Sequence, residues 1–481
     1  MSKTTLNTPL RDRYDLLIVG GGICGAAAAY EASRRGLSAL LVERSDYGEG
    51  ASSNSMKIVH GGLRYLQDYD IRRVLRSHRE LRILMKIAPH LVRPLHSELV
   101  MGGRGRLFKL KFRAGLMFYS RLAGLTDRFV HGAPRVAGSR YPYWYDGIVT
   151  DTEQLLLDFL HTAILLGSGK VSVRNYTSVD GYVHDRGQVV GARIPTLGEI
   201  KVSRVLECTG TRRRDLPVRL AMNLVVDPLT ITASRNAVGL VHPGDGRYVF
   251  VVPWRDRCMV GTYERAYPFD PCEPLRIEEG WIDEFLAWLA PAHPELSNLS
   301  REGIRFVHAG LLPKEDHATS RLLKTDRIAE TSDGRIQVLG VKYTTARVLA
   351  SEAVELAAGG LRAQRDRGGS RGGLPTLMDR RSAVEAYMDH DPHMQAPLLA
   401  GRPDLKRGDV LFAVDREQAR TLGDVLLRRT GWASAGHPGG DVVGAVATAL
   451  EERLGWPDGE KVRQIESFDN DYRFGRSLSR G

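Results

Sequence analysis

The chain is poor in cysteine and lacks long apolar runs. Four cysteines occur in 481 residues, at Cys24, Cys208, Cys258 and Cys272, and they form neither a CxxC pair nor a cluster with histidine. This scarcity argues against a disulfide framework and against a metal site such as zinc, so we expect a reducing compartment. No stretch approaches the ~18 consecutive apolar residues that span a bilayer. The first residues also lack the apolar core of a secretory signal, so we expect a cytoplasmic protein.

Positive side chains outnumber negative ones. Lysine and arginine total 68 against 57 aspartates and glutamates, which leaves a formal net charge of +11 at pH 7. Hydrophobic residues make up 42% and charged residues 26% of the chain, which is typical of a soluble globular protein and excludes a disordered one. The positive excess favours anionic partners. By itself it does not choose among phosphorylated metabolites, nucleic acid and an acidic membrane surface.

The N-terminal segment has the pattern of a strand, a helix and a second strand. The apolar run 14–19 is short, as in a buried parallel strand. An alanine-rich helix is predicted over 26–35, with Gly36 just past its end. A second apolar strand, 38–43, completes a unit of the ~30 residues expected for a strand-helix-strand motif.

A GxGxxG motif lies between the first strand and the helix. Gly20 allows the tight turn, Gly22 lets the backbone approach a pyrophosphate, and Gly25 lets the helix pack on the strand. The N-terminus of the helix favours the pyrophosphate charge. Glu43, at the end of the second strand, is placed to accept hydrogen bonds from a ribose diol. The motif predicts a dinucleotide site and leaves NAD and FAD open.

A second motif, over 50–66, combines small hydroxyl residues, a Gly-Gly turn, a cation and a phenol. Ser52 and Ser53 are able to bind phosphate oxygens, and Arg64 offers forked donors suited to a phosphate or a carboxylate. From these residues alone, a loop that enters a helix, with Arg64 in a salt bridge, explains the pattern equally well.

The rest of the chain alternates helical and extended patterns up to a break in composition. Period-two alternation dominates between 225 and 264, where a hairpin is predicted over 248–262. Residues 359–373 are almost all glycine, arginine and small polar residues, which indicates a flexible linker. Beyond it, 416–429 and 442–454 are predicted as amphipathic helices, and no internal repeat is found.

Taken together, several segments resemble the FAD-dependent glycerol-3-phosphate dehydrogenases. The resemblance is carried by DLLIVGGGICG (15–25), LVERSD (41–46), ASSNSMKIVHGGLRYL (51–66), APHLVRP (88–94), VFVVPW (249–254), GVKYTT (340–345) and RTLGDVLLRRT (420–430). It covers nearly the whole chain, and its HGGLRYL and RTLxDVLxRRT strings are far more specific than the glycine motif. The resemblance implies FAD as the cofactor and oxidation of the secondary hydroxyl of glycerol 3-phosphate by hydride transfer to the flavin. It also implies quinone or another electron acceptor, since bacterial members of the family lie on the membrane.

The fold expected for such a chain is of the α/β class. It has an FAD-binding doubly wound (Rossmann-like) domain, an antiparallel β-sheet cap domain and a small C-terminal helical domain. We expect the FAD-binding domain to comprise 12–80, 150–215 and 305–358. The cap that forms the substrate cavity is expected from 81–149 and 216–304, and the helical domain from 374–481.

The resemblance also implies which residues form the site. Arg64, Tyr65 and Lys342 are expected in the substrate pocket, in contact with the phosphate and neighbouring oxygens. Such a cationic pocket selects a dianionic substrate, and phosphate binding positions the carbinol. The residues expected to contact FAD are Gly20, Gly22, Gly25, Glu43, Ser52, Ser53, Gly62, Gly210, Gly340 and Thr344.

The sequence departs from the family pattern near the expected substrate. In the Ala-Gly-x-Arg-Pro string of the family, Leu312 replaces the arginine, and Asn223 aligns with a histidine that helps to remove the alcohol proton. Gly-Thr-Thr-Asp becomes Gly-Thr-Tyr-Glu at 261–264, and Val341 replaces the second glycine before the pocket lysine. Because leucine and an amide neither accept the proton nor stabilise an alkoxide, the sequence leaves open whether the substrate is glycerol 3-phosphate or a related phosphorylated alcohol.

His308 is the candidate for the missing base, because it lies close in sequence to the altered string. The alternative for His308 is a buried structural role. A further candidate is the stretch 104–119, whose cations beside large apolar residues suit a helix on an anionic membrane surface. An ordinary helix with one face on the core explains this stretch as well.

Two other function classes remain. One is a flavin oxidase that acts on an amine or a hydroxy acid with oxygen as the acceptor, with Arg64 bound to a carboxylate. The other is a non-catalytic relative that binds flavin structurally or uses its charge to bind nucleic acid. Arginine, tyrosine and lysine at the pocket positions favour an anionic small molecule, so no nucleic-acid partner is expected.

Overall fold

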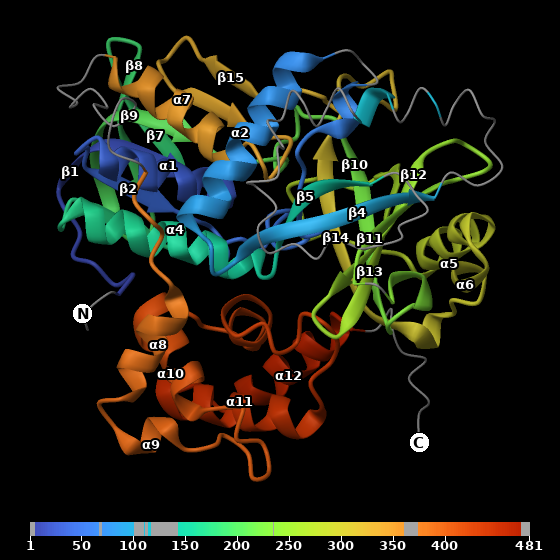
Figure 1. The fold of residues 1–481 in the computed structure, drawn as a ribbon. Helices are drawn as coiled ribbons and strands as arrows, with labels where there is room; N and C mark the ends of the chain where they lie inside the picture. The colour runs from blue at the N-terminus through green and yellow to red at the C-terminus, as the bar shows by residue number, and fades with distance from the viewer. Residues whose placement is uncertain are drawn as a thin grey trace.

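The computed structural model describes residues 5–66, 70–100, 110, 114–116, 143–233, 235–359 and 374–472, without the side chains of Arg64 and Leu66. These residues form two β-sheets, each with its own helices, and a group of C-terminal helices below them (Figure 1). Most of the basic stretch 104–119, and the linker after residue 359, lie outside the described residues. Within the described part of the chain, no helix has the length and apolar character needed to cross a membrane.

The first sheet is parallel at its centre. Its strands follow the order β15, β16, β9, β1, β2 and β6, and β8 joins β7 to β9. Their bounds are β1 (Arg13–Val19), β2 (Ala39–Val42), β6 (Val171–Arg174), β7 (Gly181–Asp185), β8 (Gln188–Ile194), β9 (Gly198–Glu207), β15 (Arg327–Glu330) and β16 (Ile336–Leu339). β1 pairs in parallel with both β2 and β9. The carboxyl ends of these three strands therefore meet at one edge, where ligands bind in open α/β sheets.

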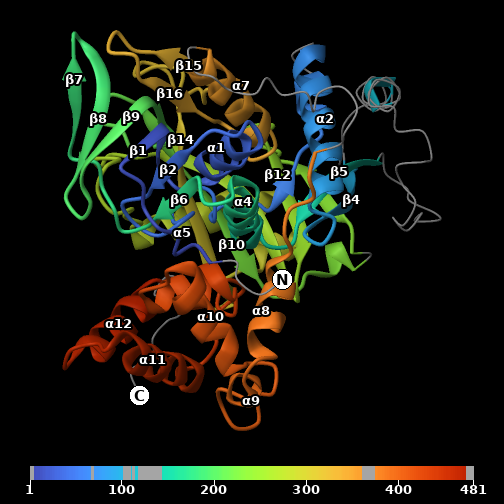
Figure 2. The same cartoon turned by 90° about the vertical axis from the view of Figure 1, so that its left-hand side faces the viewer.

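Helices cover one face of this sheet. They are α1 (Ile23–Arg34), α4 (Thr152–Gly167) and α7 (Ala346–Ala358), and α1 packs against the other two. Alternate residues of β1, Leu16 and Ile18, join the core beneath these helices. Tyr14 and Leu17 point the other way and pack against side chains of β8 and β9. β7 and β8 lie at the left-hand side in Figure 2. Burial on both faces explains the continuous apolar run of β1.

The second sheet is mostly antiparallel, as expected for the cap. Its order is β14, β10, β13, β12, β11, β4, β5 and β3. The bounds are β3 (Ile58–Val59), β4 (Val92–Val100), β5 (Tyr143–Val149), β10 (Val218–Val226), β11 (Ala237–Val241), β12 (Tyr248–Trp254), β13 (Arg257–Ala266) and β14 (Ile304–Pro313). The β12–β13 hairpin confirms the predicted one. Since β14 pairs with β10 along its length, the domain boundary expected at 305 has to move beyond Pro313.

The two faces of this sheet have different neighbours. Leu220, Met222 and Leu224 of β10 pack beneath α5 (Glu279–Leu289), beside the short α6 (Pro294–Ser297). The opposite face meets the N-terminal domain and the C-terminal helices. There, Trp254 and Phe306 share a core with Val446 of α11. The helix α2 (Ile71–Ile87) lies in sequence between β3 and β4 of this sheet.

The C-terminal helices are α8 (Arg380–Met388), α9 (Pro392–Gln395), α10 (Arg407–Glu417), α11 (Gly440–Leu454) and α12 (Glu460–Asn470). The prediction of a single helix over 416–429 is wrong. Instead, α10 ends where Gln418 adopts a left-handed conformation, with φ 61°, and a short π-helical turn follows over Asp424–Arg429. The Gln418 side chain accepts a hydrogen bond from Tyr47 and donates to Leu6 O, so contacts outside the helix hold this conformation.

A buried ionic network joins this turn to the N-terminal domain. Asp46 accepts hydrogen bonds from Arg428 Nε at 2.7 Å and from both terminal nitrogens of Arg429 at 2.7 and 2.8 Å. Asp424 accepts from the backbone N–H of Arg420 and from Tyr176. The charged residues of the RTLxDVLxRRT string therefore bind the helical domain to the loop that follows β2.

Candidate active site

The turn between β1 and α1 leaves no room for side chains. Gly20 has a φ of +110°, and a Cβ there would lie 2.5 Å from Cys208 O. A Cβ on Gly25 would overlap the carbonyl oxygen of Gly20. These close approaches bring β1, β9 and α1 together at the carboxyl edge of the sheet, as the motif predicted.

The N-terminus of α1 faces a hydroxyl from the second motif. Ile23 N donates to Ser52 Oγ at 3.0 Å, and a Cβ on Gly22 would lie 3.2 Å from the same oxygen. The first turn of α1 holds no acidic residue, and Gly22 caps it without a side chain. Free N–H groups, the helix dipole and a hydroxyl at one point suit the pyrophosphate of a dinucleotide. The residues at this point therefore fit FAD.

Glu43 lies beside the same turn. Its Oε2 accepts from Gly21 N at 2.6 Å and its Oε1 from Ser45 N at 2.9 Å. Burial raises the pKa of Glu43, while these two N–H groups partly oppose the shift. Each oxygen keeps a lone pair for a ribose hydroxyl.

We expect Glu43→Gln to weaken FAD binding about tenfold, because the amide NH2 cannot accept one of the two backbone N–H bonds or a ribose hydroxyl. The dissociation constant of FAD, measured by fluorescence titration of the apoprotein, checks this. Glu199→Gln, at an exposed position of β9, serves as the control. Equal FAD affinity of the two variants would contradict the role of Glu43.

A buried lysine anchors the loop that carries Ser52. Lys57 Nζ donates to Ser53 O at 2.7 Å and to Glu153 Oε1 at 2.8 Å. The Ser53 hydroxyl donates to Gly48 O at 2.7 Å, so it lies inside the loop, whereas Ser52 points to α1. The loop is thereby held to α4, whose first turn contains Glu153.

The segment after β16 crosses the start of α1. A Cβ on Gly340 would lie 2.7 Å from Cys24 Sγ, and Thr344 Oγ1 accepts a hydrogen bond from His60 N at 3.0 Å. Asp326 accepts from Val341 N at 3.0 Å and from Thr345 Oγ1 at 2.8 Å, which fixes the segment on both sides of Lys342.

Lys342 meets Tyr65 here. Its Nζ lies 3.5 Å from the centroid of the Tyr65 ring, a cation–π contact. Tyr65 belongs to a short turn, Leu63–Leu66, that follows Gly62, and Gly62 has a φ of +94°. Arg64 lies on the same turn, but its side chain is outside the described part. Gly210, with a φ of +61°, follows β9 at the same sheet edge.

His60 is a candidate that the sequence did not single out. Its Nδ1 lies 3.7 Å from Asp146 Oδ2, and its side chain is 45% exposed. Asp146 also accepts from Gly61 N at 2.7 Å and from Trp144 Nε1 at 2.8 Å. Burial alone would raise the pKa of Asp146, but the nearby His60 and the hydrogen bond from Gly61 N outweigh it and lower the pKa. An ionised carboxylate therefore lies next to the imidazole, an arrangement suited to a base.

One row of residues crosses the second sheet beside His60. Phe250, Gly261, Asn223 and His308 are paired in turn from β12 to β14. Thr262 Oγ1 donates to Asn223 Oδ1 at 2.8 Å, and the ring of Phe250 lies 6.3 Å from that of His60. Two residues further along β14, a Cβ on Gly310 would lie 3.3 Å from Ala51 Cα. This sheet face therefore meets the loops around the glycine turn.

His308 is at the far end of that row. It is 2% exposed, its ring contacts those of Trp254 and Phe306, and its Nδ1 lies 3.3 Å from Asn54 Oδ1. Burial, together with the charges of Lys57 and Arg255, lowers its pKa well below the ordinary value. This packing favours the structural alternative for His308.

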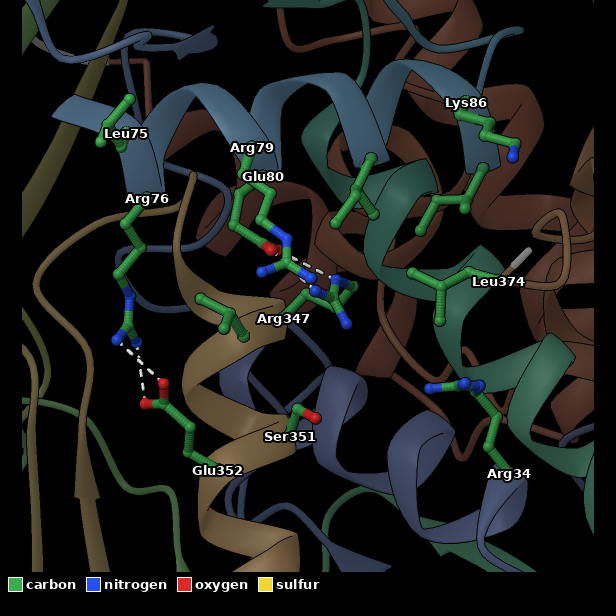
Figure 3. A pocket seen from close by; sticks show the side chains of 13 residues that line it. Arg34, Leu75, Arg76, Arg79, Glu80, Lys86, Arg347, Ser351, Glu352 and Leu374 are labelled. Carbon is green, nitrogen blue, oxygen red and sulfur yellow. Dashed lines mark hydrogen bonds and ion pairs between the residues drawn. The ribbon is translucent and has the colours of Figure 1, made fainter. Parts of the chain in front are cut away.

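A cavity of about 600 Å³ lies elsewhere, between α2 and α7 (Figure 3). Ion pairs cross its wall, Arg347 with Glu80 at 2.7 Å and Arg76 with Glu352 at 2.9 Å. None of the described residues that we expect at the site lines this cavity. In the described ranges, no group of three histidine, cysteine, aspartate or glutamate side chains is arranged to hold a metal ion.

Two family models match the chain. The model described as FAD dependent oxidoreductase matches residues 15–359. The model described as the C-terminal domain of alpha-glycerophosphate oxidase matches residues 379–461. The second match covers most of the helices that follow the linker.

Among curated proteins, the glycerol-3-phosphate dehydrogenase of Synechocystis sp. is 26% identical over 542 residues and covers 95% of each chain. The aerobic glycerol-3-phosphate dehydrogenase of Staphylococcus haemolyticus is 29% identical, over 74% of this chain and 70% of the relative. Among solved structures, the glycerol-3-phosphate dehydrogenase from Bacillus halodurans, complexed with FAD, has a TM-score of 0.68 at 22% identity and covers 96% of this chain and 95% of its own. L-proline dehydrogenase from P. horikoshii has a TM-score of 0.53 at 14% identity, over 76% of this chain and 96% of its own. These structural likenesses establish the fold.

Proposed function

Since the chain belongs to the family of FAD dependent oxidoreductases, we propose that it oxidises a hydroxyl of glycerol 3-phosphate or of a related small phosphorylated alcohol. The observation that carries the proposal is the meeting of Lys342, Tyr65 and the His60–Asp146 pair beside the glycine turn. This arrangement combines a cation for the anionic group with a base for the alcohol proton. The dehydrogenases among the relatives support the choice of substrate.

The residues that would hold FAD are those of the carboxyl edge of the first sheet. Gly20, Gly22 and Gly25 give backbone access, the N-terminus of α1 and Ser52 bind the pyrophosphate, and Glu43 binds the ribose. Gly340 lies against Cys24 of α1, and Thr344 accepts a hydrogen bond from His60 N. When bound, FAD supplies an acceptor for the hydride of the carbinol carbon.

Lys342 and Tyr65 bind the phosphate and neighbouring oxygens, and Arg64, on the same turn as Tyr65, contributes a second cation. Binding energy from the phosphate positions the distant carbinol, because the anion is held in place while the reacting carbon is aligned.

The imidazole of His60 accepts the proton of the hydroxyl as hydride leaves the carbon. The negative charge of Asp146 stabilises the imidazolium that forms and keeps Nδ1 turned inward, so that Nε2 faces the substrate. Asn223 and Thr262, on the neighbouring strands, add hydrogen-bonding groups next to this position.

We also propose that quinone or another acceptor removes the electrons afterwards. We propose in addition that the basic stretch 104–119 contacts the membrane surface. Co-sedimentation with anionic vesicles at low salt tests the membrane contact. If the protein stays in the supernatant, the proposed contact is wrong.

The function is tested by anaerobic addition of phosphorylated alcohols to the holoenzyme while the absorbance of the oxidised flavin is followed. Glycerol 3-phosphate or a close phosphorylated relative is expected to bleach the flavin at micromolar to millimolar concentration. Bleaching by amines alone, with hydrogen peroxide formed in air, would replace the proposal with an amine oxidase.

We expect Lys342→Met to raise KM for the phosphorylated alcohol about 10–100-fold, because a charge-assisted bond to the phosphate is lost while the length of the side chain is kept. Steady-state kinetics with an artificial acceptor measure this. Lys324→Met, a change of another lysine near the same segment, is the control. An unchanged KM in Lys342→Met would remove Lys342 from the phosphate site.

A further inference from the structure

Arg219 occupies an unusual position on β10. In the antiparallel pair of β10 and β14, Arg219 stands directly opposite Leu312. Arg219, Ala221 and Asn223 alternate with Leu220 and Met222, which pack beneath α5. Arg219 is therefore on the opposite face, the one that meets the loops around the glycine turn through Gly310 and Ala51.

The guanidinium of Arg219 is only partly satisfied. Its Nη2 donates to Glu264 O at 3.1 Å. Its Nε is buried and has no hydrogen-bond partner among the described residues, and no described carboxylate forms an ion pair with it. Two other arginines of the same sheet form close ion pairs: Arg265 with Glu284 at 2.6 Å, and Arg305 with Asp227. A buried N–H group without an acceptor is costly unless a ligand supplies one.

We propose that Arg219 binds the phosphate of the substrate and replaces the cation that is absent at Leu312. This inference rests on the proposed function. Side chains directly opposite in an antiparallel pair have Cβ atoms roughly 4.5–5.5 Å apart, so the stem of Arg219 starts beside Leu312. Its guanidinium, which contacts Glu264 O on β13, would turn toward the phosphate in front of Leu312. The planar guanidinium suits a phosphate because it donates two parallel hydrogen bonds. A phosphate oxygen supplies the acceptor that Nε lacks.

The first test compares Arg219→Gln with Arg265→Gln as holoenzymes. Arg265 is on the adjacent strand but faces α5, so its loss leaves the proposed phosphate position intact. We expect Arg219→Gln to raise KM for glycerol 3-phosphate about 10–100-fold and Arg265→Gln to leave it unchanged. Oxidation of unphosphorylated glycerol, at high concentration, is expected to be equal in both variants. Flavin content and melting temperature establish that both variants fold.

A second test moves the arginine across the strand pair. The double variant Arg219→Leu with Leu312→Arg restores a cation at the position opposite in the register, and we expect its KM to return to within about threefold of the wild type. Arg219→Leu alone is expected to behave like Arg219→Gln. A structural role of Arg219 would leave the double variant as impaired as the single one, and that result would overturn the proposal.

Inorganic phosphate separates the failure of this inference from that of the proposed function. Calorimetry of phosphate binding to the holoenzyme is expected to show about 10–100-fold weaker binding to Arg219→Gln than to the wild type. If no phosphorylated alcohol bleaches the wild-type flavin but phosphate binding still depends on Arg219, only the proposed function fails. If the alcohol bleaches the flavin and Arg219→Gln matches Arg265→Gln in KM and phosphate affinity, only the role of Arg219 fails.

Discussion

Replacing His60 with glutamine is expected to lower kcat for the phosphorylated alcohol about 10²–10⁴-fold, the range in which general bases contribute to catalysis. Glutamine keeps a polar group beside Asp146 but does not accept the proton of the alcohol. KM is expected to change much less, since the phosphate contacts remain. Stopped-flow measurement of flavin reduction under anaerobic conditions reports the affected step directly.

His184→Gln is the matched control for His60→Gln, because His184 also pairs with an aspartate, Asp333 at 3.1 Å, but lies on β7 of the first sheet. Asp146→Asn is expected to have a smaller effect, of about tenfold, because it removes only the charge that orients the imidazole. Flavin reduction at the wild-type rate in His60→Gln would transfer the role of base to another group.

Replacing Asp46 with asparagine is expected to destabilise the chain by about 3–5 kcal/mol, because two buried arginines lose their common counter-charge. The side chains of Asp46 and Arg429 are fully buried, and that of Arg428 is 12% exposed. Urea unfolding, followed by tryptophan fluorescence, measures the loss. Asp227→Asn removes a half-exposed ion pair with Arg305 and is expected to cost less than about 1 kcal/mol.

The same network predicts how stability depends on pH. Burial alone would raise the pKa of Asp46, but Arg429 and Arg428 outweigh it and hold the pKa far below its ordinary 3.8. In the same way Arg380 and His161 lower the pKa of Glu417 from 4.5 to about 2 despite burial. The unfolded chain therefore binds these protons first, so their contribution is complete above pH ~4.5 and is lost as the pH falls toward 2.

The stability difference between the wild type and Asp46→Asn is accordingly expected to shrink as the pH is lowered below ~4. A difference under about 1 kcal/mol at pH 7, or one that grows on acidification, would show that this network does not hold the helical domain in place.

Local patterns predicted the N-terminal unit well. β1, α1 and β2 depend on an apolar run, an alanine-rich helix and glycines in close backbone contact, all within 30 residues of each other. The β12–β13 hairpin and α11 were also predicted, because each is formed by residues that are close to each other in the sequence. The helix expected over 416–429 failed for the opposite reason. Gln418 ends α10 through its bonds to Tyr47 and Leu6, which are distant in sequence.

The amino-acid sequence by itself determined the dinucleotide turn, because spacing along the chain suffices to define it, whereas the cations proposed for the substrate pocket follow from the family resemblance. Only the tertiary structure decided which polar groups meet. Asp146 is brought to His60 by β5 and the turn after β3, and Arg219 is brought opposite Leu312 by the β10–β14 register. Strand pairing sets such contacts between segments many residues apart, and no periodicity in the sequence specifies the partner or the register.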